Sequence, residues 1–163
     1  MTIKHRPFNS PLESGLRSLY LLDEINLDDV DLQRLVFYDY LLVHSGDVTN
    51  GPVSLHPNIP HRSGEWVVRR NIVSQGLDMM FSRQLITKKF TENGICYSSS
   101  NLTKPFLNHL KSEYSKNLRE YSKWVIDTFG NESEDELKRF MTSHIGEWGA
   151  EFKMESILTG ENA

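Results

Sequence analysis

The hydrophobic positions near the start of the chain recur at helical spacing in two stretches. Ser10 stands three residues before Glu13 with a proline between them, the pattern of a capping box that opens on a proline. The spacing of the leucines that follow predicts a helix over 11–24. A second helix is predicted over 32–44, with Asp31 as its N-cap. Because 32–44 is apolar on nearly every side, we expect this helix to be buried at the centre of the fold.

Proline, glycine and histidine then interrupt the periodic pattern. Residues 45–62 are expected to form an ordered loop, because two prolines restrict its backbone and lower the entropy lost on ordering. Ser63 can cap a third helix that runs to about Gln75. Gly76 breaks the apolar stretch that follows, and we predict a turn at this glycine between two short helices.

The pattern changes from helical to β-prone between Leu85 and Tyr97. Two short runs flank the pair Asn93-Gly94, which strongly indicates a hairpin closed by a tight primed turn. Helical periodicity returns afterwards and predicts helices over about 103–110 and 112–129. Ser133 then begins a second capping box, which opens a last helix.

This order of elements is typical of one fold class. Two short helices joined at a glycine, followed by a hairpin and another helix, is the order of a winged helix-turn-helix. The prediction is therefore a mainly α fold with a small β-hairpin, a winged helix-turn-helix-like single domain over 1–163 with extra N- and C-terminal helices. The N-terminal helices occupy 10–44, the helix-turn-helix and wing 63–97, and the C-terminal helices 103–150.

Charge is unevenly distributed along the chain. The net charge is -4, which gives no general attraction to nucleic acid. Between positions 62 and 97, however, six basic residues face three acidic ones, whereas the segments on either side are acidic. Basic residues of this kind contact DNA phosphates, contact an acidic partner, or are simply solvated. The candidates are Arg69, Arg70, Arg83, Lys88 and Lys89.

The cysteine count and the hydropathy indicate in which cellular compartment the protein is expected. The single cysteine, Cys96, cannot form an internal disulfide or a multi-thiolate zinc site, and a structural thiol in a strand is expected. The first residues lack the apolar run of a signal peptide, and no stretch approaches the length of a membrane span. We therefore expect a cytoplasmic protein that makes no membrane contact.

The loop over 45–62, with His44 just before it, contains residue types found in metal sites and in catalytic sites, and we call it the histidine-rich loop. His44, His56 and His61 do not have the spacing of a known metal motif. Ser45 lies beside His44, but no G-x-S-x-G elbow exposes a serine nucleophile, and no phosphate-binding loop occurs. We predict no catalytic, cofactor-binding or metal-binding residues and no cofactor. The loop is expected to cover the core or to dock a partner. The candidate docking residues are His44, Ser45, Gly46, Asp47, His56, His61, Arg62 and Glu65.

Four stretches carry a family resemblance. They read RPFNSPLESGLRSLYLLD, DLQRLVFYDYLLVHSGD, GPVSLHPNIPHRSGEWVVRR and GLDMMFSRQLI. Together they resemble the small middle component of bacterial ABC-type three-component systems, the group that includes Lamassu-type anti-phage defence. The similarity runs from about Arg6 to Phe129 and continues more weakly through NESEDELKRFM. Within it, HSGD, SLHP and RSGE match the family's pattern.

The resemblance implies a function that the residues alone do not show. It implies a non-catalytic, winged-helix adaptor encoded beside an SMC-like ABC ATPase and a separate effector, often a nuclease, with non-specific DNA contact inside the complex left open. Two alternatives come from the residues themselves. One is a stand-alone winged-helix DNA-binding regulator that uses the basic segment, and the other is a metallohydrolase that uses the histidine-rich loop.

Overall fold

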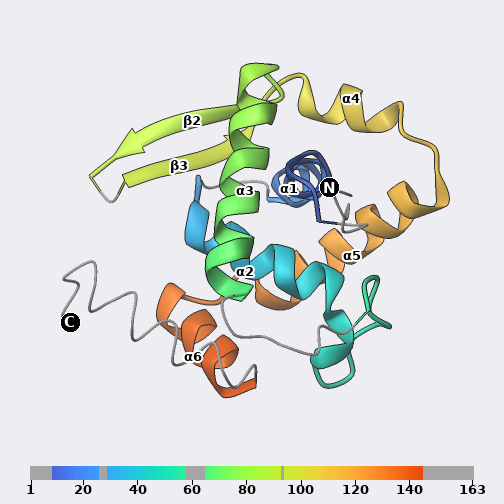
Figure 1. Cartoon of the computed structure of the whole chain (residues 1–163), viewed down its shortest axis with the longest axis vertical. Helices are drawn as coiled ribbons and strands as arrows, with labels where there is room; N and C mark the ends of the chain where they lie inside the picture. Colours follow the sequence, from blue (N-terminus) through green and yellow to red (C-terminus); the bar gives the residue numbers. More distant parts are fainter. Residues whose placement is uncertain (1–8, 26–28, 58–64, 93, 145–163) are drawn as a thin grey trace, which may run out of the picture.

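A computed structural model describes residues 9–25, 29–57, 65–92 and 94–144 of the chain (Figure 1). Within these ranges it contains six α-helices, one short 3-10 helix and three strands. The elements in chain order are α1 Pro11–Glu24, β1 Val30–Asp31, α2 Leu32–Val43, η1 Ser45–Asp47, α3 Glu65–Ser82, β2 Ile86–Thr91, β3 Gly94–Ser99, α4 Thr103–Asn108, α5 Glu113–Phe129 and α6 Glu134–His144.

The helix α2 lies in the interior, as its apolar sequence predicts. All of its residues from Leu35 to Val43 are buried. Its N-cap is Asp31, whose side chain accepts a hydrogen bond from the backbone N–H of Arg34 at 2.8 Å. Helices α1, α3 and α5 pack around it, and Figure 1 shows α3 running along the front of the molecule beside α1, which is seen end-on. The predicted central position of this helix is confirmed.

The predicted turn at Gly76 is wrong, because α3 continues through it as one helix of 18 residues. Gly76 is instead the point at which α3 approaches α1 most closely. A Cβ atom on it would lie 2.6 Å from the backbone N of Gly15 and 2.6 Å from the backbone O of Pro11. The glycine therefore serves helix packing and not a change of chain direction.

A three-stranded antiparallel sheet lies beside α3, with strand order β1-β3-β2. The predicted hairpin is confirmed: β2 and β3 pair from Ile86 with Ser99 to Thr91 with Gly94. Gly94 has a φ of 111°, a value that glycine adopts readily. Residue 93 lies outside the described part, so the predicted turn type is not tested. The two-residue strand β1 was not predicted, and Cys96 lies half-buried in β3.

The C-terminal helices follow the predicted boundaries closely. The Ser112 side chain caps α5, and Ser133 forms a reciprocal capping box with Glu136 at the start of α6. In α6, Leu137 and Met141 are buried against the core. The predicted helix cap Ser63 lies outside the described residues.

The observed architecture is a mainly helical single domain with a small antiparallel sheet. The helix-turn-helix predicted over 63–85 does not occur as such, because its described part is the single helix α3 followed by a short turn into β2. The hairpin expected as the wing is present. Among the described residues, no helix is both long enough and apolar enough to cross a membrane.

Candidate functional site

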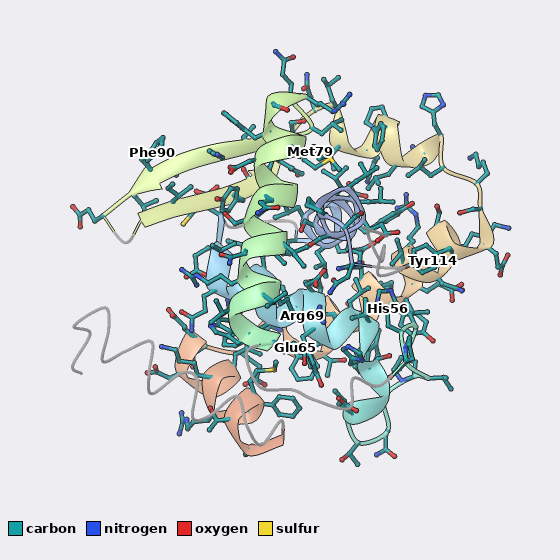
Figure 2. All side chains as sticks on the ribbon, viewed as in Figure 1. His56, Glu65, Arg69, Met79, Phe90 and Tyr114 are labelled. Carbon is teal, nitrogen blue, oxygen red and sulfur yellow. The ribbon has the colours of Figure 1, made fainter. Side chains whose placement is uncertain are left out.

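The histidine-rich loop is fastened to α5 along one face of that helix. The Val53 carbonyl accepts a hydrogen bond from the Tyr121 hydroxyl at 2.7 Å. His56 Nε2 lies 3.0 Å from the Tyr114 hydroxyl, and the two rings are nearly parallel. Figure 2 shows these two side chains next to each other. Because Tyr114 and Tyr121 are two helical turns apart, the loop runs along α5 and covers it.

The two ends of the described loop also meet each other. The His56 N–H donates to the Val43 carbonyl at 3.1 Å, and the Gly46 N–H donates to the Ser54 hydroxyl at 2.9 Å. Asp47 accepts a hydrogen bond from the Tyr40 hydroxyl of α2. These contacts tie the loop to the end of α2 and hold it in one conformation.

Two of the predicted docking residues are therefore corrected. His44 and Ser45 are buried, so neither can meet a partner at the surface. Gly46 is exposed, Asp47 and His56 are half-buried, and all three have internal contacts. His61 and Arg62 lie outside the described residues. Of the two expectations for this loop, covering the core describes the part up to residue 57.

His56 is held in its neutral form by this environment. Burial, and after it the nearby Arg17 charge, lower its pKa from 6.5 to about 4. Burial also raises the pKa of its neighbour Tyr114, against the opposing effect of Arg17. Both side chains therefore stay uncharged near neutral pH and share a neutral hydrogen bond.

The pKa of His56 predicts a pH dependence of stability. The unfolded chain takes up a proton near pH 6.5, whereas the folded chain does so only near pH 4. The stabilisation from neutral His56 is thus complete above about pH 6.5 and is lost as the pH falls to about 4. We expect His56→Gln to flatten the fall in the free energy of unfolding across this window, measured by urea denaturation.

The control for this experiment is His109→Gln, which removes an exposed histidine just after α4. It should retain the slope of the wild type. Equal slopes for the wild type and His56→Gln would show that His56 does not make this contribution.

A buried ion network lies beneath the loop and links three helices. Asp39 of α2 accepts hydrogen bonds from Arg17 Nε of α1 at 2.6 Å and from Arg69 Nη1 of α3 at 2.6 Å. Arg17 Nη2 reaches the second carboxylate oxygen at 3.2 Å, which makes this pair bidentate. Arg69 also pairs with Glu65 one turn earlier at 3.0 Å, as Figure 2 shows.

Each charge in this network is compensated by another. Burial opposes the ionised form of Asp39, but the charges of Arg17 and Arg69 and their hydrogen bonds outweigh it, so the pKa of Asp39 is lowered. Burial likewise opposes the charge on Arg17, and Asp39 outweighs it, so the pKa of Arg17 is raised. With Glu65, the network holds two positive and two negative charges and is neutral in sum.

The network corrects a second prediction from the sequence. Arg69 is only 4% exposed and its ion pairs are internal, so it cannot reach a DNA phosphate or an acidic partner. Glu65, a candidate docking residue, is the partner of Arg69. Arg17 and Asp39 were not singled out from the sequence. The available signal was Asp39 itself, a carboxylate inside an otherwise apolar stretch.

The remaining basic candidates lie at or near the surface. Lys88 pairs with Asp78 at 2.9 Å, and its ammonium lies 4.6 Å from the centre of the Phe81 ring. Lys89 pairs with Asp29 at 3.1 Å. Both lysines are therefore partly neutralised within the chain.

Two arginines from the same list differ in exposure. Arg83 is exposed at the end of α3, whereas Arg70 is half-buried within that helix. Among its described residues, the predicted basic segment thus contributes one exposed arginine, at the point where α3 turns into β2.

Polar side chains in and beneath the loop are hydrogen-bonded to one another. Among the described residues, no group of three or more His, Cys, Asp or Glu residues is arranged to hold a metal ion. The ring nitrogen of His56 is engaged by Tyr114, and the Asp39 carboxylate is engaged by two arginines. The arrangement supports a structural role for the polar residues in and beneath the loop.

Comparison with known proteins gives one family. The model of a family described as ABC-three component (ABC-3C) system Middle Component 2 matches residues 7–151, most of the chain. No curated protein and no solved structure matches the chain.

Proposed function

The chain belongs to the Middle Component 2 family of ABC-three component systems, and we propose that within such a system it is a non-catalytic adaptor. In this proposal it binds an SMC-like ABC ATPase and a separate effector, often a nuclease, in a bacterial anti-phage or anti-plasmid complex in the cytoplasm. The observation that carries the proposal is the family match over residues 7–151, because a middle component acts with the other components of its system.

The use of the polar residues supports a non-catalytic role. His56 and Tyr114 fasten the loop, while Asp39 is bound by two arginines and has no open side. A catalytic acid, base or nucleophile has to reach a substrate, and these groups are occupied by one another. Their contacts are those of a rigid body that presents surfaces to partners.

The order of elements supports a winged-helix ancestry for the adaptor. The chain runs α1-β1-α2-α3-β2-β3, and the hairpin follows α3 and pairs with the short strand β1. In this proposal α3 is the helix that precedes the wing. The wing projects beyond the helices, and Figure 2 shows Phe90 near its outer end.

The charges argue against a stand-alone DNA-binding regulator. Of the five basic candidates, Arg69 is buried, and Lys88 and Lys89 pair with carboxylates of the chain. Non-specific binding to DNA requires several cations that can each displace counterions from phosphates. Of the five candidates, Arg83 is exposed and is in none of these ion pairs, so DNA contact within the assembled complex would have to rely on it.

Co-purification tests the proposal directly. The tagged chain is co-expressed with the ATPase and the effector encoded beside its gene, and the eluted proteins are quantified. We expect a stoichiometric complex with at least one of them, and no ATPase or nuclease activity from the chain alone. A tagged unrelated protein of similar size and charge is the control. Recovery of neither component at low salt would disprove the adaptor role.

A further inference from the structure

A surface ridge forms where the end of α3 meets the start of α4. The Ser100 hydroxyl donates to the Gln84 carbonyl at 2.8 Å, and the Thr103 hydroxyl donates to the Leu85 carbonyl at 2.6 Å. These bonds hold the turn after α3 against the start of α4. We give the name α4 ridge to five exposed side chains from the end of α3 and from the segment that runs from the start of α4 to just before α5: Arg83, Leu102, Lys104, Phe106 and Lys111.

The ridge includes exposed apolar side chains in α4 and just before it, and the opposite face of this helix packs against α1. Thr103 and Leu107 of α4 are buried, and α4 packs on α1 through its inner face. On the outer side, Leu102 is 42% exposed and Phe106 is 37% exposed. Burying these two apolar side chains against a partner would be favourable.

The three cations of the ridge differ from other exposed lysines in their ion pairing. In the described part of the chain, no salt bridge involves Arg83, Lys104 or Lys111. Glu113, close to the ridge in sequence, pairs with Lys116. Exposed lysines elsewhere, such as Lys89 and Lys123, do pair with carboxylates. The ridge is therefore a local excess of positive charge within a protein of net charge -4.

One group of exposed carboxylates lies far from this ridge. The exposed carboxylates around the start of α6 are Glu132, Glu134, Asp135 and Glu136. Figure 1 shows α4 and α6 at opposite ends of the long axis of the molecule. These carboxylates cannot neutralise the ridge of the same chain, which leaves its charge available to another molecule.

We propose that the α4 ridge docks an acidic protein segment that carries apolar side chains, provided by one of the other two components of the system. The inference rests on the proposed adaptor function. Leu102 and Phe106 would pack against the apolar side chains of that segment, while Arg83, Lys104 and Lys111 would pair with its carboxylates.

A protein segment fits the ridge better than DNA does. Leu102 has no ring on which a base could stack, and an exposed leucine gains nothing from a phosphate backbone. A second copy fits less well too, because the ridge and the acidic turn of α6 are different surfaces. A contact between them would be head-to-tail and would build chains of molecules instead of a closed dimer.

The test compares two double variants with the same change in net charge. Lys104→Glu/Lys111→Glu reverses two ridge cations, and Lys123→Glu/Arg139→Glu reverses two exposed cations on α5 and α6. The dissociation constant for the purified ATPase and for the purified effector is measured at two salt concentrations. A third variant, Leu102→Ser/Phe106→Ser, removes the apolar contacts. Circular dichroism and thermal melting confirm that each variant folds.

We expect the ridge charge variant to bind one component about tenfold or more weakly, with a reduced dependence on salt, whereas the control variant binds as the wild type does. The apolar variant should also bind that component more weakly. If the wild type binds and the ridge variants bind equally well, the ridge inference is wrong and the adaptor role stands. If the wild type binds neither component, both fail.

Two further measurements separate the alternative occupants. Duplex DNA binding and sedimentation are recorded for the wild type and the ridge charge variant. If the ridge substitutions abolish DNA binding but leave component binding intact, the ridge is a DNA site and the inference is overturned. It is also overturned if they only convert oligomers of the chain to monomers.

Discussion

Replacing Asp39 with alanine is expected to destabilise the protein by about 3–5 kcal/mol. The substitution removes the carboxylate that both Arg17 and Arg69 contact and leaves Arg69 with Glu65, and a buried charge that loses its main partner is strongly unfavourable. Because single domains unfold with a total of about 5–15 kcal/mol, the variant should be marginally folded or unfolded at 37 °C. Urea denaturation followed by circular dichroism measures the difference.

A matched control separates burial from charge. Asp127→Ala removes the carboxylate of an exposed pair with Lys123, in which the two charged atoms are 2.7 Å apart. Exposed pairs contribute about 0–1 kcal/mol, so this variant should remain close to the wild type. Equal stability of the two variants would mean that the Asp39 network is not a major stabilising feature.

An apolar replacement of the network gives a second control. Arg17→Met/Asp39→Leu/Glu65→Leu/Arg69→Met removes all four charges together, and substitutions of this kind often leave stability unchanged or raise it. Recovery of stability in this quadruple variant would assign the effect of Asp39→Ala to uncompensated charge and not to lost volume.

The lowered pKa of Asp39 sets the pH range of this test. Its folded-state pKa lies below the ordinary value of 3.8, so its contribution is present above that value and is lost as the pH falls through the folded pKa. At neutral pH Asp39 is ionised, and the full effect of the substitution should be seen there.

The second large effect is expected from Gly76→Ala. Alanine ordinarily stabilises a helix by about 0.5–1 kcal/mol relative to glycine. At this position, however, the added methyl group would lie 2.6 Å from the Gly15 nitrogen and 2.9 Å from the Gly15 Cα, and backbone atoms cannot rotate away. We expect helices α1 and α3 to be forced apart, with a net loss of about 1–3 kcal/mol in the free energy of unfolding.

Two companion variants identify the cause. Gly15→Ala, on the opposite helix, should be destabilising as well, because its methyl group would lie 2.8 Å from the Gly76 carbonyl oxygen. Gln75→Ala, at an exposed neighbouring position on α3, should be close to neutral. Stabilisation by Gly76→Ala would show that the close approach of the two helices is wrong.

The sequence predicts a feature correctly where the interacting residues are close to one another along the chain. Ser10 and Glu13 form the predicted capping box, and so do Ser133 and Glu136. The hairpin belongs to the same class, since its strands are neighbours in sequence. In each case the partners lie within a few residues of each other, so no distant part of the chain has to be known.

The predictions that failed depended on distant partners. A glycine such as Gly76 is typical of a turn. Its actual role is to let α3 approach α1, which lies about 60 residues earlier in the sequence. Arg69 has the pattern of a surface cation, yet its partner Asp39 is 30 residues away on another helix. The strand β1 is two residues long and exists through pairing with β3. Periodicity describes the two faces of an element but does not identify what covers them.

The amino-acid sequence by itself determined most of the helices, the capping boxes at Ser10 and Ser133, the hairpin and the family to which the chain belongs, because these depend on local hydrogen bonding and on residue pattern. Only the tertiary structure decided which charges are buried and which remain on the surface. It placed Arg69 in the core and left the cations of the α4 ridge without an internal partner. The physical reason is that a charge is neutralised by proximity in space, and the packing of helices from distant parts of the chain sets that proximity.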